Sequence, residues 1–198
     1  VSKKIKVFCP EINEMYEKGL NYNQYNFNGI DSKLEGKYRK GHFNGVATIV
    51  SKLFELFKPN QAFFGEKDFQ QTQIIKRLIN LEKHNTKLII CPTIREKNGL
   101  AMSSRNSLLS QKNRENSSII FHNLNYVKTH FKKTDFDEII SKCIKSINSC
   151  DGFKTEYFEI VDSFSLSKQK KYSTDKSYRV FVSVMVDEVR LIDNILLN

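Results

Sequence analysis

The feature that most constrains the fold is an alternation of helical and strand-like apolar patterns between residues 41 and 91. Apolar residues recur at three- and four-residue steps over 41–58 and again over 68–83, which is the spacing of a helix with one buried face. Short apolar runs over 62–64 and 87–91 follow these helices, and a glycine or a proline closes each run. Helices and strands that alternate with short connections are typical of a parallel, doubly wound α/β sheet.

The same spacing predicts which residues are buried. The expected apolar faces consist of Phe43, Val46, Val50, Leu53, Phe54 and Phe57 in the first helix and of Ile74, Ile75, Leu78, Ile79 and Leu81 in the second. Upstream, 7–9 is predicted to be the end of a buried strand, followed by a short helix over 10–18 with Pro10 in its first turn. We expect residues 21–40 to form a long polar surface loop with room for one edge strand.

After Pro92 the pattern changes to helices followed by strands. The predicted elements are helices over 112–131 and 135–149, the second with Thr134 as its N-cap, and strands over 155–161, 178–186 and 189–197. This order indicates a small α+β domain. We place the boundary near residues 92–95, so that 1–92 belong to the parallel-sheet domain and 93–198 to the second domain.

Charge and hydropathy limit the possible partners. The net charge of +10 and the pI of about 9.4 suit a polyanion such as nucleic acid. The lysines are scattered, however, and no RNP-like aromatic motif, zinc finger or glycine-clamped loop accompanies them. A solvated lysine-rich surface, which would also favour a phosphate-bearing small substrate, is the simpler interpretation. No apolar run approaches the roughly 18 residues of a membrane span, and the first residues do not resemble a signal peptide.

The four cysteines do not suggest a metal site. Cys9, Cys91, Cys143 and Cys150 lie far apart, without Cys-x-x-Cys spacing, in a chain too large to need a disulfide framework. We interpret them as buried or idle thiols of a cytoplasmic protein.

The most informative stretch is residues 63–71, Phe-Phe-Gly-Glu-Lys-Asp-Phe-Gln-Gln, where a predicted strand meets a helix. Open α/β sheets bind ligands at this edge, and the free N–H groups of a helix N-terminus suit phosphate. Gly65 lets the backbone approach a ligand, Lys67 supplies a cation, and Asp68 can accept from ribose hydroxyls. Gln71 lies one helical turn after Lys67, so both can face one ligand. An ordinary strand-to-helix turn capped by Asp68 would have the same pattern.

A second candidate is the stretch 95–105, which ends in Met102-Ser103-Ser104-Arg105. Two hydroxyls beside an arginine make a compact anion clamp, with short donors and a permanently charged planar fork. Its position between the two predicted domains would let closure bring the clamp onto a nucleotide. By itself, the pattern also fits a serine-rich loop with a surface arginine.

Together the motifs resemble a known family. Gly41-His42-Phe43-Asn44-Gly45-Val46, Phe64-Gly65-Glu66-Lys67-Asp68-Phe69-Gln70-Gln71 and Gly99-Leu100-Ala101-Met102-Ser103-Ser104-Arg105-Asn106 are similar, in order and spacing, to motifs of pantothenate synthetases (pantoate–β-alanine ligases). Arg190-Leu191-Ile192-Asp193-Asn194 resembles the family's C-terminal strand. The resemblance runs from Val7 to the end of the chain.

The resemblance implies a Rossmann-like, nucleotidyltransferase-type domain and a ligase. The family joins pantoate to β-alanine with ATP and Mg²⁺, through a pantoyl-adenylate, and releases pyrophosphate and AMP. It also implies a homodimer. Carried over by motif, the ATP site would consist of Gly65, Glu66, Lys67, Asp68, Ile94, Met102, Ser103, Ser104 and Arg105.

The resemblance also implies individual roles. The residues that would contact the phosphates and act in catalysis are Lys67, Ser103, Ser104 and Arg105. The last three of these would lie on a lid formed by the second domain. Asp68 would bind the ribose, Ile94 would line the adenine site through its backbone, and Gln71 would hydrogen-bond pantoate. No metal-ligating side chain is assigned.

His42 belongs to the first motif, where loop ordering near the substrate and helix-start packing are equally good explanations.

The chain departs from the family at its beginning. The family's Pro-Thr-Met-Gly, His-x-Gly-His and Asn-Pro-x-Gln-Phe segments are absent from the 198 residues. We therefore expect an upstream part of the natural protein to be missing and the 198-residue chain alone to be inactive. The alternative function is a non-catalytic basic module that binds RNA or a partner protein.

Overall fold

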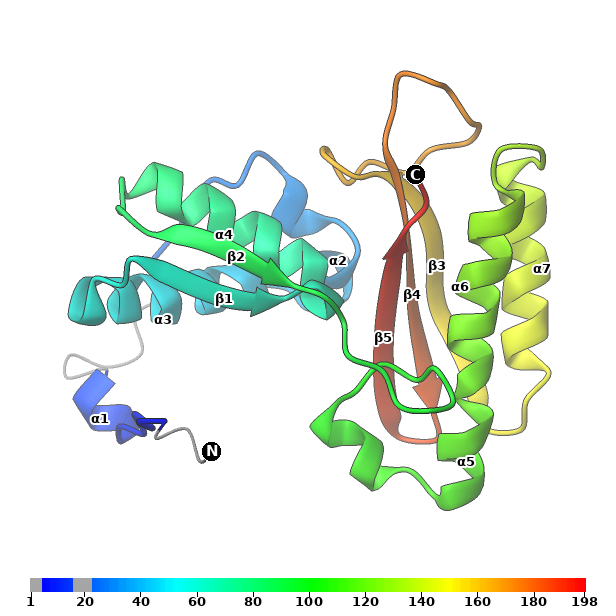
Figure 1. Cartoon of the computed structure of the whole chain (residues 1–198), viewed down its shortest axis with the longest axis horizontal. Coiled ribbons are helices and arrows are strands. Elements are labelled where there is room, and N and C mark those ends of the chain that lie inside the picture. The colour runs from blue at the N-terminus through cyan, green and yellow to red at the C-terminus, as the bar shows by residue number, and fades with distance from the viewer. Residues whose placement is uncertain (1–4, 16–22) are drawn as a thin grey trace.

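The computed structural model describes residues 5–15 and 23–198 and consists of two groups of elements, visible in Figure 1. The first holds a two-stranded parallel sheet, β1 (Gln61–Gly65) and β2 (Lys87–Cys91), with α3 (His42–Phe57) and α4 (Phe69–Leu81). The second holds an antiparallel sheet in the order β3 (Phe153–Asp162), β4 (Tyr178–Val186) and β5 (Val189–Leu196), backed by helices. The predicted α/β fold class is confirmed.

The predicted core of α4 is largely confirmed, since Ile74, Ile75 and Leu78 are fully buried. Leu81, at the end of this helix, and Phe57, at the end of α3, are more than half exposed, contrary to the prediction. Each is the last residue of its helix. α3 ends at Phe57, and its C-cap Lys58 adopts a left-handed conformation with φ of 42° and is followed by Pro59.

β1 is covered on one face rather than buried on both, as its apolar run had suggested. Phe63 is 64% exposed, while its neighbours Ala62 and Phe64 pack against the core. Successive side chains of a strand point to opposite faces. Only the face with Ala62 and Phe64 is therefore covered within the described part of the chain.

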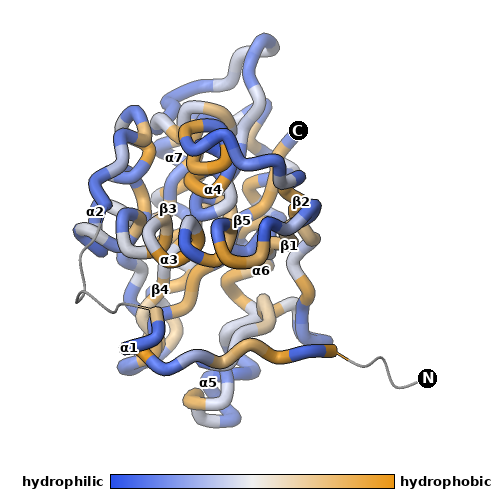
Figure 2. The backbone as a smooth tube through the Cα atoms, turned by 90° about the vertical axis from the view of Figure 1, so that its left-hand side faces the viewer, coloured by the Kyte–Doolittle hydropathy of each residue, from blue (hydrophilic) through white to orange (hydrophobic). Residues whose placement is uncertain are grey.

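The predicted buried strand at 7–9 is wrong. Residues 5–11 form no strand, and Val7 is 85% exposed. The short helix predicted after Pro10 is present as α1 (Ile12–Met15), and residues 16–18 lie outside the described residues. Figure 2 shows this segment as a tube that passes below α3, where Phe8 meets Phe57 edge to face at 4.9 Å. Without hydrogen-bonding neighbours, three apolar residues do not make a strand.

The predicted polar surface loop also needs correction over its described residues, 23–40. They contain no strand but a 3₁₀ turn, η1 (Ile30–Ser32), and a short helix, α2 (Glu35–Tyr38). Phe27, Ile30 and Leu34 are at most 3% exposed and belong to the core. The turn is so tight that a Cβ at Gly36 would lie 1.7 Å from the Asp31 carbonyl oxygen. The three apolar anchors are three and four residues apart, which is a helical spacing, but the positive φ values of Asn28 (53°) and Gly29 (76°) interrupt any continuous helix. Their polar, glycine- and asparagine-rich surroundings concealed a packed segment.

The second half confirms the three predicted strands and modifies the helices. The predicted helix over 112–131 is two helices, α5 (Gln111–Asn116) and α6 (Ser118–His130), which meet at Ser117. The second prediction corresponds to α7 (Phe136–Asn148). Its N-cap is Asp135 instead of Thr134, because the Asp135 carboxylate accepts from the N–H groups of Asp137 and Glu138 at 2.9 and 3.1 Å.

The antiparallel sheet joins two cores because its two faces are both covered. On β3, Phe158 and Ile160 pack against α6 and α7, whereas Tyr157 and Val161 pack against the core of α3 and α4. Phe181 on β4 belongs to this second core as well. Alternate residues of one strand thus serve different cores. The division into 1–92 and 93–198 stays a prediction.

The four cysteines are free thiols, from fully buried Cys143 on α7 to exposed Cys9. Burial raises the pKa of Cys143 to about 12, so this thiol is a packing group of the core.

Candidate active site

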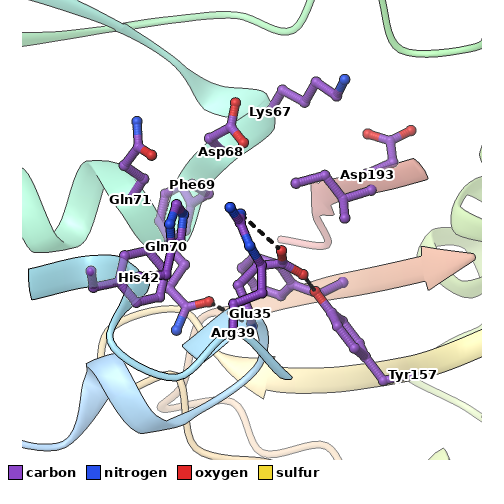
Figure 3. Close-up of a pocket in the computed structure, with 13 residues that line it drawn as sticks. Glu35, Arg39, His42, Lys67, Asp68, Phe69, Gln70, Gln71, Tyr157 and Asp193 are labelled. Carbon is purple, nitrogen blue, oxygen red and sulfur yellow. Dashed lines mark hydrogen bonds and ion pairs between the residues drawn. The ribbon is translucent and has the colours of Figure 1, made fainter. Parts of the chain in front are cut away.

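The site lies where the parallel strands point at the antiparallel sheet. The carboxyl ends of β1 and β2 face β5 in Figure 1, and a small cavity, partly open to solvent, lies at this junction. Its lining comes from five parts of the chain: Glu35, Arg39, His42 and Phe43; Lys67, Asp68, Phe69, Gln70 and Gln71; Tyr157 on β3; Phe181 on β4; Ile192 and Asp193 on β5. Figure 3 shows these groups converging. A second cavity shares Glu35, Arg39, Lys67, Asp68 and Ile192 with the first.

The first motif forms the strand-to-helix edge, as predicted. Gly65 ends β1 in an extended conformation, and a Cβ there would meet nothing within 4 Å. Its backbone therefore borders open space. Glu66–Asp68 form the 3₁₀ turn η2, and α4 begins directly after it. Lys67 and Asp68 line both cavities.

Burial perturbs both charged groups of this turn. It lowers the pKa of the Lys67 ammonium and raises the pKa of the Asp68 carboxyl, while each opposes the shift of the other. Asp68 makes no hydrogen bond or ion pair with any described residue, and no side-chain cap to α4 is formed. The simple interpretation of Asp68 as a helix cap therefore does not apply in this conformation.

The second motif meets the first. The Lys67 ammonium donates to the Met102 carbonyl at 3.2 Å, and Ser103 and Arg105 line the second cavity with Lys67. The Ser103 hydroxyl accepts from the Arg105 N–H at 3.2 Å and caps the 3₁₀ turn η3 (Ser104–Leu108). The arginine head lies near β5, with its Nη1 3.5 Å from the Arg190 carbonyl oxygen.

Four other predicted residues differ in their relation to these cavities. Gln71 and His42 line the first cavity, and burial together with Arg39 lowers the pKa of His42 and favours its neutral form. Ile94 lines neither cavity and is 66% exposed, but its carbonyl accepts from the Met102 N–H at 2.9 Å, which fixes the start of the loop. Ser104 also lines neither cavity in this conformation, and its carbonyl accepts from Ser107 at 2.7 Å.

An ion-pair network on the cavity wall escaped the sequence interpretation. Arg190 on β5 donates to both carboxylate oxygens of Glu35 at 2.6 and 2.8 Å and to Glu156 at 2.9 Å, while the Tyr157 hydroxyl donates to Glu35 at 2.7 Å. Burial raises the pKa of Glu35, but the bonds from Arg190 and Tyr157 outweigh it and lower the pKa overall. Glu156 sits at a β-bulge between Thr155 and Tyr157, which lets neighbouring side chains reach one network.

Gln70, within the first motif, has a role that its position alone did not indicate. Its side chain is 3% exposed, accepts from the Glu35 N–H at 3.0 Å and donates to the carbonyls of Ile30 and Lys33 at 2.7 Å each. It thus fixes the segment before α2 against the start of α4. The sequence does not indicate which of the adjacent Gln70 and Gln71 is buried, because the hydrogen-bond partners of Gln70 lie 35 to 40 residues away in the chain.

The described residues contain no group of three or more His, Cys, Asp or Glu side chains arranged to hold a metal ion. Among these residues, too, no helix is long and apolar enough to cross a membrane.

Cations at the carboxyl edge of a parallel sheet, beside a helix N-terminus, form the arrangement with which open α/β proteins commonly bind phosphate-bearing ligands. The family model described as pantoate-beta-alanine ligase matches residues 2–196. The chain therefore belongs to the pantoate–β-alanine ligase family.

Individual relatives agree with this assignment. A pantothenate synthetase of Flavobacterium psychrophilum is 40% identical over 98% of this chain and 69% of its own length. The crystal structure of pantothenate synthetase from Thermus thermophilus superimposes with a TM-score of 0.86 at 31% identity, covering 95% of this chain and 68% of that one. A pantoate-beta-alanine ligase from Francisella tularensis, complexed with beta-gamma ATP and beta-alanine, matches with a TM-score of 0.70 at 33% identity, over 93% and 62% of the two chains.

These matches confirm the family recognised from the motifs and the assignment as a pantoate–β-alanine ligase. They do not favour the alternative of a non-catalytic basic module.

Proposed function

We propose that this chain takes part in ATP-dependent ligation of pantoate and β-alanine through a pantoyl-adenylate. The observation that carries the proposal is the contact between the two motifs, in which Lys67 reaches the Met102 carbonyl at 3.2 Å although 35 residues separate them. It places a lysine, a serine and an arginine around one cavity in a member of this ligase family. The relative crystallised with an ATP analogue and β-alanine supports the same substrates.

In the first step, a carboxylate oxygen of pantoate attacks the α-phosphorus of ATP. The bond from that phosphorus to the bridging oxygen breaks, and pyrophosphate leaves with the electron pair. Lys67 and Arg105, with the Ser103 and Ser104 hydroxyls, would stabilise the negative charge that develops on the phosphates. In the second step, the β-alanine amine attacks the acyl carbon, AMP leaves, and the amine gives up a proton.

The remaining roles follow the motif positions. Asp68, which has no partner among the described residues, is free to accept from ribose hydroxyls, and Gln71 on the first turn of α4 would hydrogen-bond pantoate. The Ile94 backbone would border the adenine.

Mg²⁺, which the resemblance implies, commonly binds through substrate phosphates and only one or two carboxylates. The residues fit such an ion, because the described cavity wall carries the separate carboxylates of Glu35, Asp68 and Asp193 and no cluster of three ligands. It would neutralise phosphate charge.

The test is steady-state kinetics on the purified protein and its variants. AMP and pyrophosphate should appear only when pantoate and ATP are both present. Lys67→Ala and Arg105→Ala should each lower kcat/KM by roughly 10²–10³-fold, which corresponds to about 2.7–4 kcal/mol. Gln71→Ala should raise KM for pantoate more than KM for ATP.

Lys168→Ala is the matched control, because Lys168 is an exposed lysine whose contact with Asp137 spans 3.8 Å. Its kinetics should equal those of the wild type. Near-wild-type turnover of both the Lys67 and Arg105 variants would reject the assigned roles. The homodimer that the resemblance implies also belongs to this proposal, and light scattering on the purified protein measures it.

A further inference from the structure

Two neighbouring residues of β5, Asp193 and Asn194, form hydrogen bonds with the two motifs, which are the turn 65–68 and the loop 95–105. Asn194 is 2% exposed, and its amide donates to the carbonyls of Glu66 and Lys67 at 3.0 and 2.8 Å. The side-chain amide oxygen of Asn194 accepts from the guanidinium of Arg179 on β4 at 2.5 Å. Arg179 in turn donates to the Glu66 carboxylate at 2.8 Å and lies 3.9 Å over the ring of Phe69. The antiparallel sheet therefore holds the turn that carries Lys67 through hydrogen bonds to the backbone of the turn and to the Glu66 side chain.

Asp193 holds the other motif in a comparable way. Its carboxylate, 4% exposed, accepts two hydrogen bonds from Arg95 at 2.6 and 3.0 Å. Arg95 also donates to the Gly99 carbonyl at 3.1 Å and lies 3.9 Å over the ring of Phe121. A backbone bridge between Arg95 and Ala101 carries this anchorage to the residue before Met102. Figure 3 shows Asp193 on the same side of the cavity as Lys67.

We propose that Asp193 and Asn194 are positioning residues for the adenylation step and that β5 sets the relative position of Lys67 and the Met102–Arg105 loop. The proposal rests on the proposed function. The carbonyl and N–H of a peptide plane point in opposite directions, so the Asn194 clasp also fixes where the N–H groups of Lys67 and Asp68 point. Displacement of a catalytic group by about 1 Å can cost on the order of 10²-fold in rate.

The test is a double-mutant cycle in the full-length protein. Asn194→Asp keeps the size of the side chain and its bond from Arg179 but replaces the amide donor with an oxygen that faces two carbonyls. It should lower kcat/KM for ATP by about 10²-fold. If Asn194 acts through Lys67, the double variant with Lys67→Ala should be no slower than Lys67→Ala alone, within about twofold.

Asn123→Asp is the matched control for lost stability. Asn123 is 7% exposed on α6 and donates to the Ile119 carbonyl at 2.9 Å and to Ser146 at 3.2 Å, away from both motifs. This variant should melt earlier and keep the kcat/KM of the wild type. Should Asn194→Asp fail to fold, Asn194→Ser removes the amide without adding a charge and takes its place. Asp193→Asn, combined with Arg105→Ala, repeats the cycle for the second motif.

The outcomes separate the two proposals. The proposed function stands, and the positioning role is overturned, if Lys67→Ala lowers kcat/KM and the loss in the double variant is the product of the two single losses. The same conclusion follows if Lys67→Ala lowers kcat/KM and Asn194→Asp keeps the wild-type value. A Lys67→Ala variant with wild-type kinetics would remove the proposed function together with the positioning role.

Discussion

At the scale of single residues, chemistry at the cavity depends on how each charge is partnered. Lys67 and Asp68 lie side by side without a dedicated ion-pair partner among the described residues, so both stay available to a ligand. Glu35, in contrast, is fully engaged by Arg190 and Tyr157. The same cavity wall thus combines a carboxylate that is unpaired within the described part of the chain with one that is fully engaged in hydrogen bonds.

The engaged carboxylate predicts a pH dependence of stability. Because the pKa of Glu35 is lower in the folded protein than its ordinary value of 4.5, its ionised form stabilises the fold above that pH. This contribution is lost as the pH falls from 4.5 through the lower folded pKa. Glu35→Gln should lower the free energy of unfolding at pH 7 by about 3 kcal/mol, the lower end for breaking a buried ion pair, since Arg190 keeps Glu156.

Urea melts at a series of pH values measure this effect. The free energy of unfolding should fall less steeply below pH 4.5 in Glu35→Gln than in the wild type, whereas Glu55→Gln, an exposed change on α3, should follow the wild-type curve. Parallel curves for Glu35→Gln and the wild type would contradict the role of the ion pair.

At the scale of elements, short polar signals decide where a helix begins. Thr134 and Asp135 are both good capping residues, but only the Asp135 carboxylate reaches two free N–H groups of α7. Choosing between adjacent candidates requires the backbone conformation, which the amphipathic pattern of the helix leaves open.

This difference is directly measurable. Asp135→Ala should destabilise the protein by about 0.5–2 kcal/mol, because two N–H groups lose their acceptor. A thermal melt should show a fall in Tm of roughly 2–4 °C for each kcal/mol in a chain of this size. Thr134→Ala, one residue earlier, should leave Tm unchanged, and an equal loss in both variants would refute the assignment of the cap.

At the scale of the whole molecule, the antiparallel sheet couples two cores. Tyr157, Val161 and Phe181 enter the core of α3 and α4, while their strand neighbours enter the core of α6 and α7. Burial on both faces makes this sheet the structural link between the motif-bearing turn and the helical layer of Figure 1.

The coupling predicts which elements lose stability when a core residue of the sheet is truncated. Phe181→Ala should cost about 3–5 kcal/mol, since a large aromatic side chain leaves a cavity between the sheet and the first core. Amide hydrogen exchange should then accelerate in α3 and α4 as well as in β4. Ile147→Ala, which removes a buried side chain of the other core only, should affect α6 and α7 first. Acceleration confined to β4 in Phe181→Ala would contradict the shared core.

The periodic elements and the two motifs were predictable from the sequence because their signals are local. The stripes of α3 and α4, the strands after residue 153 and the turn at 65–68 depend on spacing over a few residues. The split at Ser117 and the exposed face at Phe63 had no such local signal, and the helical spacing of Phe27, Ile30 and Leu34 was masked by the polar, glycine-containing residues around them.

The sequence by itself determined the fold class and the family and located the two candidate motifs, since each rests on residues close together in the chain. Only the tertiary structure decided what surrounds those motifs. Glu35 lies 155 residues from Arg190, Asn194 lies 127 from Lys67, and Arg95 lies 98 from Asp193. Such partners meet because the carboxyl ends of β1 and β2 face β5, and no spacing within one element encodes that encounter.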